Sequence, residues 1–137
     1  MRILTEADVQ DACVLLAPRY GARLWRNNSG ALKDAGGRLV RFGLGNVSAQ
    51  LNRVWKSSDL IGRTARGRFV AVECKPPGWS ILGHRLTDHE LAQLAFLMDV
   101  AWSGGLATFC SDPRQLEEAL RRDLDRDGKI LPAPQQP

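Results

Sequence analysis

The stretch RFVAVECK (residues 68–75) is the longest strand that the sequence predicts. Its phenylalanine and valines favour a buried strand, and the two prolines that follow it end the strand. Glu73 and Lys75 stand two residues apart, so in an extended chain their side chains share one face while Cys74 points to the other. This strand therefore ends either in a plain exposed ion pair or in an acid and a base presented to a site.

The segment before this strand favours the second interpretation. SDLIG (residues 58–62) predicts a short strand and RTARG (residues 63–67) a turn. If the turn pairs the two strands, the hairpin returns Asp59 to Glu73. Two carboxylates, together with the backbone carbonyl of Cys74, form a set of hard oxygen ligands that suits Mg²⁺ or Mn²⁺. Lys75 would then lie within reach of a phosphate oxygen at that metal.

The rest of the chain supplies further strands and three helices. Thr5 and Asp8 predict the start of a first helix, and Thr87 and Glu90 form a capping box for a second. Asp112 and a following proline open a third. The apolar stripe expected on the second helix consists of Leu91, Leu94, Ala95, Met98 and Trp102.

Strands are expected within residues 22–28 and 36–45 and at residues 106–110. Residues 27–30 are expected to form a turn, and residues 46–57 and 76–85 irregular loops. This order predicts an α/β fold with a mixed β-sheet flanked by helices. The connection from Lys75 through the second helix to residues 106–110 should be a right-handed crossover between parallel strands.

The composition fits one ordinary globular domain. The chain has 137 residues, of which 44% are hydrophobic and 25% charged. We expect one domain at residues 1–125 and a proline-rich, disordered tail at residues 126–137. There is no apolar run of the roughly 20 residues that a membrane span needs and no signal peptide, so a cytoplasmic protein is expected. Three cysteines without a CxxC pair predict small buried residues rather than a zinc site or a disulfide framework.

The positive charge is concentrated in one segment. The net charge is +4, and between residues 19 and 68 eleven bases face only two acids, Asp34 and Asp59. Such a segment is typical of a polyanion binder, with solvated surface charge as the alternative. The residues expected to contact DNA are Arg26, Asn27, Asn28, Arg41 and Lys56. A polar turn is the alternative for residues 26–28. For Trp79, stacking on an unpaired base and packing of its own loop remain equal alternatives.

Several ordered motifs resemble one nuclease family. The chain resembles the VRR-NUC nucleases of the PD-(D/E)XK superfamily in a series of motifs. These are WRNNSG (25–30), VRFGLG (40–45), SSDLIG (57–62), FVAVECK (69–75), a helix with Gln93 and WSGGLATFCSD (102–112). The resemblance runs from about Thr5 to Leu120, and the size is similar to that of the small stand-alone phage and bacterial members. Ser58 replaces the proline usual before the first carboxylate, and Cys74 replaces an aliphatic residue.

The resemblance implies a restriction-endonuclease-like core and a set of site residues. Asp59 and Glu73 would bind Mg²⁺ or Mn²⁺ together with the Cys74 carbonyl, Lys75 would be the catalytic lysine, and Gln93 would orient Lys75 or the attacking water. Glu6 would complete the metal site, with a simple helix-capping role as its alternative. The implied activity is metal-dependent hydrolysis of DNA phosphodiesters, on branched or structured DNA, by a homodimer with no membrane partner. The alternative is a non-catalytic nucleic-acid-binding module that retains the fold.

Overall fold

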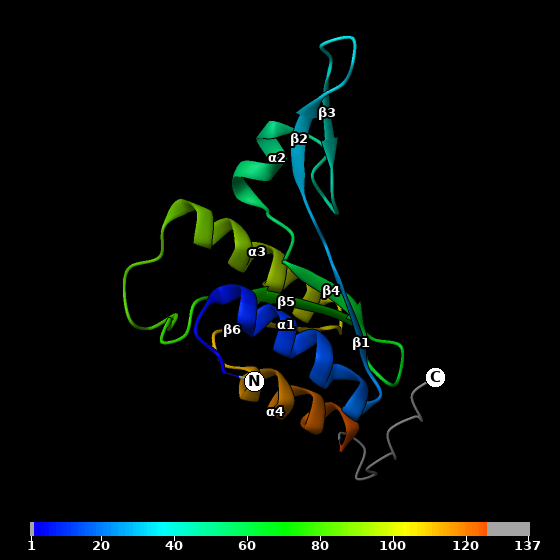
Figure 1. Ribbon diagram of the computed structural model, residues 1–137, viewed down its shortest axis with the longest axis vertical. Helices are drawn as coiled ribbons and strands as arrows, with labels where there is room; N and C mark the ends of the chain where they lie inside the picture. Colours follow the sequence, from blue (N-terminus) through cyan, green and yellow to red (C-terminus); the bar gives the residue numbers. More distant parts are fainter. Residues whose placement is uncertain (1, 126–137) are drawn as a thin grey trace.

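The computed structural model describes residues 2–125 (Figure 1); the predicted proline-rich tail at residues 126–137 lies outside the described residues. The elements in chain order are α1 (Glu6–Leu16), the 3-10 helix η1 (Ala17–Tyr20), β1 (Arg23–Arg26), β2 (Gly30–Lys33), β3 (Leu39–Phe42), α2 (Ala49–Val54), β4 (Leu60–Arg63), β5 (Phe69–Cys74), α3 (Asp88–Trp102), β6 (Leu106–Cys110) and α4 (Pro113–Leu124). None of the described helices has the length and apolar character needed to cross a membrane.

Four of the strands form one mixed sheet in the order β1-β4-β5-β6. β4 pairs antiparallel with both β1 and β5, and β5 pairs parallel with β6. The predicted turn closes the β4–β5 hairpin through a hydrogen bond from Thr64 N–H to the Arg68 carbonyl (2.8 Å). The predicted mixed sheet flanked by helices and the parallel crossover strand are therefore confirmed.

Helices cover both faces of this sheet, and β5 contributes to both (Figure 1). Val70, Val72 and Cys74 point to the core beneath α1 and α4. Ala71 points to the smaller core beneath α3. This alternation follows from the two-residue period of a strand. It places Glu73 and Lys75 on the α3 side, opposite Cys74, as the sequence predicts.

The predicted helix starts are confirmed. Thr5 and Asp8 form a capping box at α1, Thr87 and Glu90 form another at α3, and Asp112 caps α4 ahead of its first-turn proline. Each cap satisfies backbone N–H groups that a helix start leaves without partners. The second cap matters for the site, because it fixes where α3 begins and hence which of its side chains reach β5.

The prediction for residues 46–57 was wrong. They contain α2, whose first turn is capped by Ser48: its Oγ accepts a hydrogen bond from the Leu51 N–H (3.1 Å). Trp55, the residue that follows α2, packs edge-on against Phe96 of α3 with ring centroids 4.9 Å apart. A helix of six residues carries too little periodicity to be recognised in the sequence, and here a cap and one aromatic contact hold it in place.

The prediction of a turn at residues 27–30 and of one strand within residues 36–45 was incomplete. β2 begins at Gly30 and pairs antiparallel with β3 in a separate two-stranded sheet. We call residues 30–42 the β2–β3 arm; it projects away from the main sheet (Figure 1). Alternation along β2 is hidden by its alanine and glycine, which explains why the sequence did not reveal this strand.

The apolar stripe predicted for α3 was also wrong. The buried side chains of α3 include Ala92, Phe96, Leu97 and Val100, whereas Trp102 is 93% exposed and Leu91 and Met98 are exposed as well. The helix carries two apolar stripes at the same 3.6-residue spacing, and periodicity alone does not indicate which one faces the sheet.

Candidate active site

Asp59 and Glu73 lie opposite each other at the end of the β4–β5 hairpin. The register pairs Leu60 with Val72, so Asp59 comes just before β4 at the level of Glu73. The Asp59 N–H donates to Glu73 Oε2 (3.1 Å), and Asp59 Oδ2 accepts from the Cys74 N–H (2.9 Å). The structure thus brings the two predicted carboxylates together, each held by the backbone of the opposing strand.

The Cys74 carbonyl lies on the same side of β5 as Asp59. In an antiparallel pair the N–H and C=O of one residue point toward the same neighbouring strand, and the N–H of Cys74 points at Asp59. The thiol points the other way and is fully buried, where its neighbours are the equally buried Cys13 and Cys110. The three cysteines, distant in sequence, thus meet in the core.

Gln93 of α3 connects the acid of the strand to its base. Gln93 Nε2 donates to Glu73 Oε1 (2.6 Å), and Gln93 Oε1 accepts from Lys75 Nζ (2.7 Å). Glu73, Lys75 and Gln93 are only 4%, 8% and 6% exposed. A plain exposed ion pair, the alternative that the sequence left open, does not describe this arrangement, because both charged groups are buried and an amide separates them.

Burial and charge set the protonation behaviour of Glu73. Burial, reinforced by the negative charge of Asp59, raises the pKa of Glu73 to about 8, although the positive charge of Lys75 acts in the opposite direction. The pKa of Glu6 is also raised, first by burial and then by Asp59, with Lys75 again opposing. Glu6 thus lies within electrostatic reach of the same two groups, at the first turn of α1.

This donor set fits a divalent cation. The carboxylates of Asp59 and Glu73 lie at the same end of the hairpin, and the Cys74 carbonyl points toward the same neighbouring strand. Burial first, and then the negative charge of Asp59, raise the pKa of Glu73, and a hard cation would offset both effects. Within residues 2–125 there is no cluster of three or more His, Cys, Asp or Glu side chains arranged as a metal site. The set therefore consists of Asp59, Glu73 and backbone oxygen, and the role of Glu6 as a further ligand stays a prediction.

A pocket of about 260 Å³ opens beside the two carboxylates. We call it the active-site pocket; its walls are Asp59, Glu73, Gln93, Lys56, Ser57, Asn52, His89, Ser29, Gly30 and Asn46. Lys56, predicted to contact DNA, lies on its wall. Asn52 and Asn46 come from residues 46–57, so the segment wrongly expected to be an irregular loop forms part of the pocket.

His89 is a pocket residue that the sequence reasoning missed. Gln93 Nε2 lies 3.1 Å from His89 Nε2, and because an amide nitrogen only donates, His89 must accept through Nε2. Burial lowers the pKa of His89, and the positive charges of Lys56 and Lys75 lower it further, which agrees with a neutral ring. The signal was present: His89 and Gln93 are four residues apart and share one face of α3.

Asn27 has a scaffolding position. Its Nδ2 donates to Ser57 Oγ and to the Ser58 carbonyl (both 2.8 Å), and its Oδ1 accepts from the Leu44 N–H (3.1 Å). Both of its amide donors, which a phosphate contact would need, are thus engaged. The side chain instead joins the end of β1, the segment before β4 and the segment after β3.

The other residues predicted to contact DNA lie apart from one another. Arg26 forms an ion pair with Asp11 of α1 (2.8 Å) on the exposed surface, and Asn28 is exposed. Arg41 donates to Asn46 Oδ1 (3.1 Å) at the base of the β2–β3 arm. Arg41 and Lys56 are therefore close to the active-site pocket, whereas Arg26 points back to α1.

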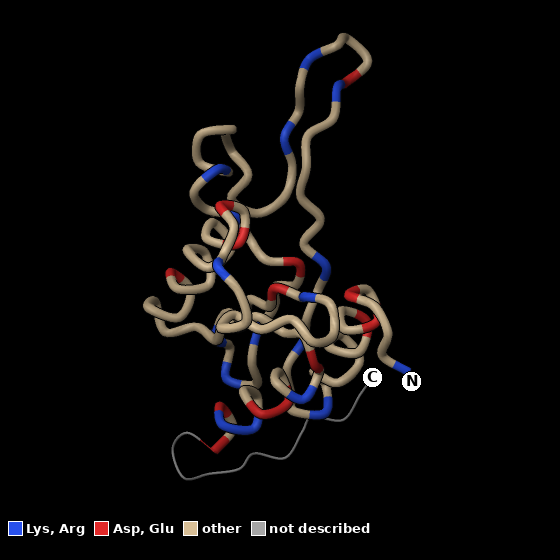
Figure 2. Tube along the Cα trace, turned by 90° about the vertical axis from the view of Figure 1, so that its left-hand side faces the viewer, with Lys and Arg blue, Asp and Glu red and all other residues tan. Residues whose placement is uncertain are grey.

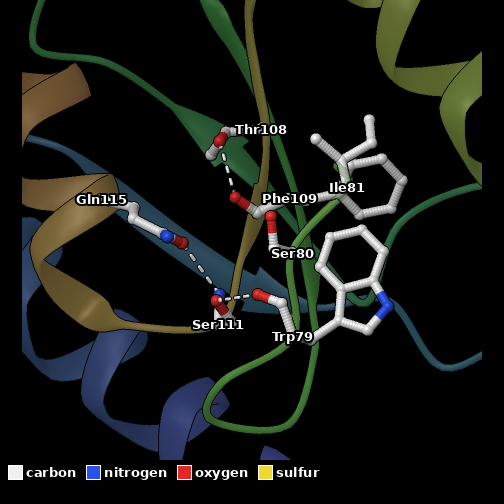
Figure 3. Close-up of a pocket in the computed structure, with 7 residues that line it drawn as sticks. All are labelled: Trp79, Ser80, Ile81, Thr108, Phe109, Ser111 and Gln115. Carbon is white, nitrogen blue, oxygen red and sulfur yellow. Dashed lines mark hydrogen bonds between the residues drawn. The ribbon is translucent and has the colours of Figure 1, made fainter. Parts of the chain in front are cut away.

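Trp79 packs within its own loop, and its stacking on an unpaired base stays a prediction. Its Nε1 donates to Glu90 Oε2 (2.8 Å), and its carbonyl accepts from Ser111 Oγ (2.8 Å). Figure 3 shows the ring beside Phe109 at the edge of a second pocket of about 320 Å³; the two ring centroids are 4.9 Å apart. Lys75 Nζ lies 5.4 Å from the Trp79 ring and 5.7 Å from the Phe109 ring, so the two aromatics form a wall behind the lysine.

Comparison with protein-family models, with curated proteins and with solved structures found no match to this chain.

Proposed function

We propose that the chain is a metal-dependent endonuclease that hydrolyses DNA phosphodiester bonds. The observation that carries the proposal is a row of hydrogen-bonded side chains, Glu73, Gln93 and Lys75, that begins beside Asp59. A hairpin that ends in two opposed carboxylates and a buried lysine has no evident structural need for them, because burying charge costs stability. A function at the site accounts for that cost.

Mg²⁺ or Mn²⁺ is the cofactor that these residues would hold, through Asp59, Glu73 and the Cys74 carbonyl. Bound there, the ion would polarise the phosphate and lower the pKa of a water molecule. The oxygen-only donor set favours these hard cations over zinc.

The protein's own groups supply binding and positioning. The ammonium of Lys75 donates one hydrogen bond to Gln93 and has further N–H donors that can bind a phosphate oxygen and stabilise the negative charge developing on it. Gln93 holds Nζ in place, because its amide nitrogen is fixed by Glu73. Trp79 and Phe109 exclude water from one side of the ammonium.

The element order supports a restriction-endonuclease-like core of the VRR-NUC kind. In chain order the core consists of a helix (α1), three antiparallel strands (β1, β4 and β5), a second helix (α3) and a parallel strand (β6). The β2–β3 arm and α2 are inserted between β1 and β4. On this view the inserted segment varies the substrate-binding surface while the core retains the chemistry.

The test uses two single substitutions in the site. Lys75→Ala and Asp59→Asn should abolish cleavage of a panel of linear and branched DNAs in Mg²⁺ and in Mn²⁺ while leaving DNA affinity in chelator nearly unchanged. Arg19→Ala, an exposed residue of η1, is the matched control and should cleave like wild type. A Lys75→Ala protein that cleaves as fast as wild type in Mn²⁺ would show that the lysine is not catalytic. DNA binding without any metal-dependent cleavage by wild type would favour the non-catalytic module.

We also propose that the protein acts as a homodimer, because paired active sites suit opposed strands of branched DNA. The first and last helices were expected to supply the dimer contact. α1 exposes Leu15, whereas the leucines of α4 are buried, so α1 is the better candidate. Sedimentation at micromolar concentration should give twice the chain mass. A single species of monomer mass would exclude the homodimer under those conditions.

A further inference from the structure

The β2–β3 arm is exposed to solvent along most of its length. It projects beyond the main sheet in both views (Figures 1 and 2), and every residue from 31 to 40 is exposed. An isolated two-stranded ribbon is at best marginally stable in water. A ribbon that is held out from the body in this way is therefore best explained by a partner that it contacts.

The register gives the arm two different faces. Ala31 lies opposite Arg41 and Lys33 opposite Leu39, so both bases share one face. The other face carries Leu32, Val40 and Phe42. A third base, Arg38, follows the turn. Figure 2 shows these positive charges spread along the arm.

The positive charges of the arm are poorly neutralised. Within residues 2–125 no acid pairs with the side chains of Lys33 or Arg38. The one acid of the arm, Asp34, is used in the turn: its Oδ1 accepts from the N–H groups of Gly36 and Arg38 (both 2.9 Å). The arm thus offers unpaired cations to a polyanion.

The base of the arm is part of the active-site pocket. Ser29 and Gly30 line that pocket together with Asp59 and Glu73. The buried Asn46 donates through Nδ2 to the carbonyls of Gly30 (2.8 Å) and Phe42 (3.0 Å), one from each strand, and accepts from Arg41. Asn46 therefore fixes the direction of the arm relative to the pocket.

We propose that the arm is a second DNA-contact surface, whose bases hold the phosphates of the duplex next to the bond that is cleaved. The inference rests on the proposed nuclease function. A DNA strand with one phosphate in the pocket continues past the pocket wall, and the base of the arm forms part of that wall. Strands of four residues are about 13 Å long, which matches the rise of about four base pairs. Phosphates of that length of duplex are complementary to Lys33, Arg38 and Arg41.

The experiment compares two double variants with the same change in charge. Lys33→Ala/Arg38→Ala removes two bases from the arm, and Arg19→Ala/Arg122→Ala removes two from η1 and α4, at the opposite end of the molecule. Affinity for a labelled DNA duplex is measured in chelator at a series of salt concentrations. Each lost phosphate contact reduces the slope of log K against log salt by about 0.9. The arm variant should therefore lose about 1.8 from the slope, and the control variant should keep the wild-type slope.

A second assay separates this inference from the nuclease proposal. The small diester bis(p-nitrophenyl) phosphate can be hydrolysed in the pocket in Mn²⁺ but is too small to reach Lys33 or Arg38. The arm variant should therefore hydrolyse it at the wild-type rate. If wild type hydrolyses neither this diester nor DNA, the nuclease proposal fails, while the slopes in chelator still decide whether the arm binds DNA.

Three outcomes would overturn the arm's role. Equal loss of slope in both double variants would show that charge acts diffusely over the molecule. An arm variant that loses hydrolysis of the small diester would place these bases in the active site. An unchanged slope in the arm variant would show that the arm does not contact DNA. If Leu32→Ser/Val40→Ser also lowers the molecular mass in solution, the arm binds a second copy of the chain instead.

Discussion

Two adjacent asparagines at the end of β1 have different roles. Asn27 uses both amide donors and its oxygen to join three backbone segments, and its own N–H donates to the Asp59 carbonyl (2.7 Å). It therefore holds the segment from which Asp59 extends. Asn28 is exposed and remains free to contact a ligand.

Asn27→Ala should destabilise the protein by about 2–3 kcal/mol, because three hydrogen bonds, two of them part-buried, are lost at about 1 kcal/mol each. Asn28→Ala should change stability by less than about 0.5 kcal/mol, as is usual for an exposed residue. Denaturant unfolding followed by tryptophan fluorescence measures both values. If Asn28→Ala is as destabilising as Asn27→Ala, the assignment of the scaffolding role to Asn27 alone is wrong.

At the residue scale, the meeting of the two carboxylates was predictable, but the residues that support them were not. The two-residue period of β5 and the short turn before it were enough to bring Asp59 and Glu73 together. Asn46 and Asn27 could not be found in this way, because an asparagine that bonds to distant backbone has no local pattern. The backbone partners of Asn46 and Asn27, the carbonyls of Gly30 and Ser58, are 16 and 31 residues away in the chain.

At the element scale, the loop between β5 and α3 depends on one carboxylate. Glu90 accepts hydrogen bonds from the Thr87 N–H (2.9 Å) and from Trp79 Nε1 (2.8 Å), and His84 Nε2 lies 3.1 Å from it. These contacts, the Thr87 N–H first among them, lower the pKa of Glu90 to about 2. The same residue thus caps α3 and holds Trp79 against the wall behind Lys75.

Acid should loosen this loop. The unfolded chain binds a proton at Glu90 near the ordinary pKa of 4.5 and the folded protein only near 2, so the stabilisation is complete above about pH 4.5 and is lost as the pH falls toward 2. In thermal unfolding, the difference in Tm between wild type and Glu90→Gln should therefore be largest above pH 4.5 and shrink below it. Asp88→Asn, in the same helical turn, is the control. A difference that stays constant down to pH 2 would contradict this role.

Element predictions succeeded where a local signal and the packing agreed. The capping boxes of α1 and α3 and the β4–β5 turn are marked by residue types that form them locally. α2, β2 and the buried side of α3 depend on contacts that the chain makes only once folded, such as Trp55 with Phe96. The inserted segment between β1 and β4 was therefore the least predictable part of the fold.

At the scale of the whole molecule, the site and the stability of the fold oppose each other. Glu73 lies in the interior beside a second acid, and its raised pKa is the measure of that unfavourable environment. Replacing Glu73 with glutamine keeps the shape and removes a group whose charged form is disfavoured in this environment. It should also remove a ligand that a divalent cation needs.

Mn²⁺ should accordingly stabilise the wild-type protein but not Glu73→Gln. A ligand that binds only the folded state adds about 2.7 kcal/mol to the free energy of unfolding at 100 times its Kd, and thermal unfolding in a Mn²⁺ series detects such an increase without any nuclease assay. In chelator, Glu73→Gln should lose no more than about 1 kcal/mol, because the amide oxygen can replace only one of the two carboxylate oxygens that accept from Gln93 Nε2 and from the Asp59 N–H. Glu118→Gln, the same substitution at an exposed position of α4, should keep the full Mn²⁺ response. If Mn²⁺ raises the Tm of Glu73→Gln as much as that of wild type, the cation binds elsewhere, and the pocket between Asp59 and Glu73 is not the metal site.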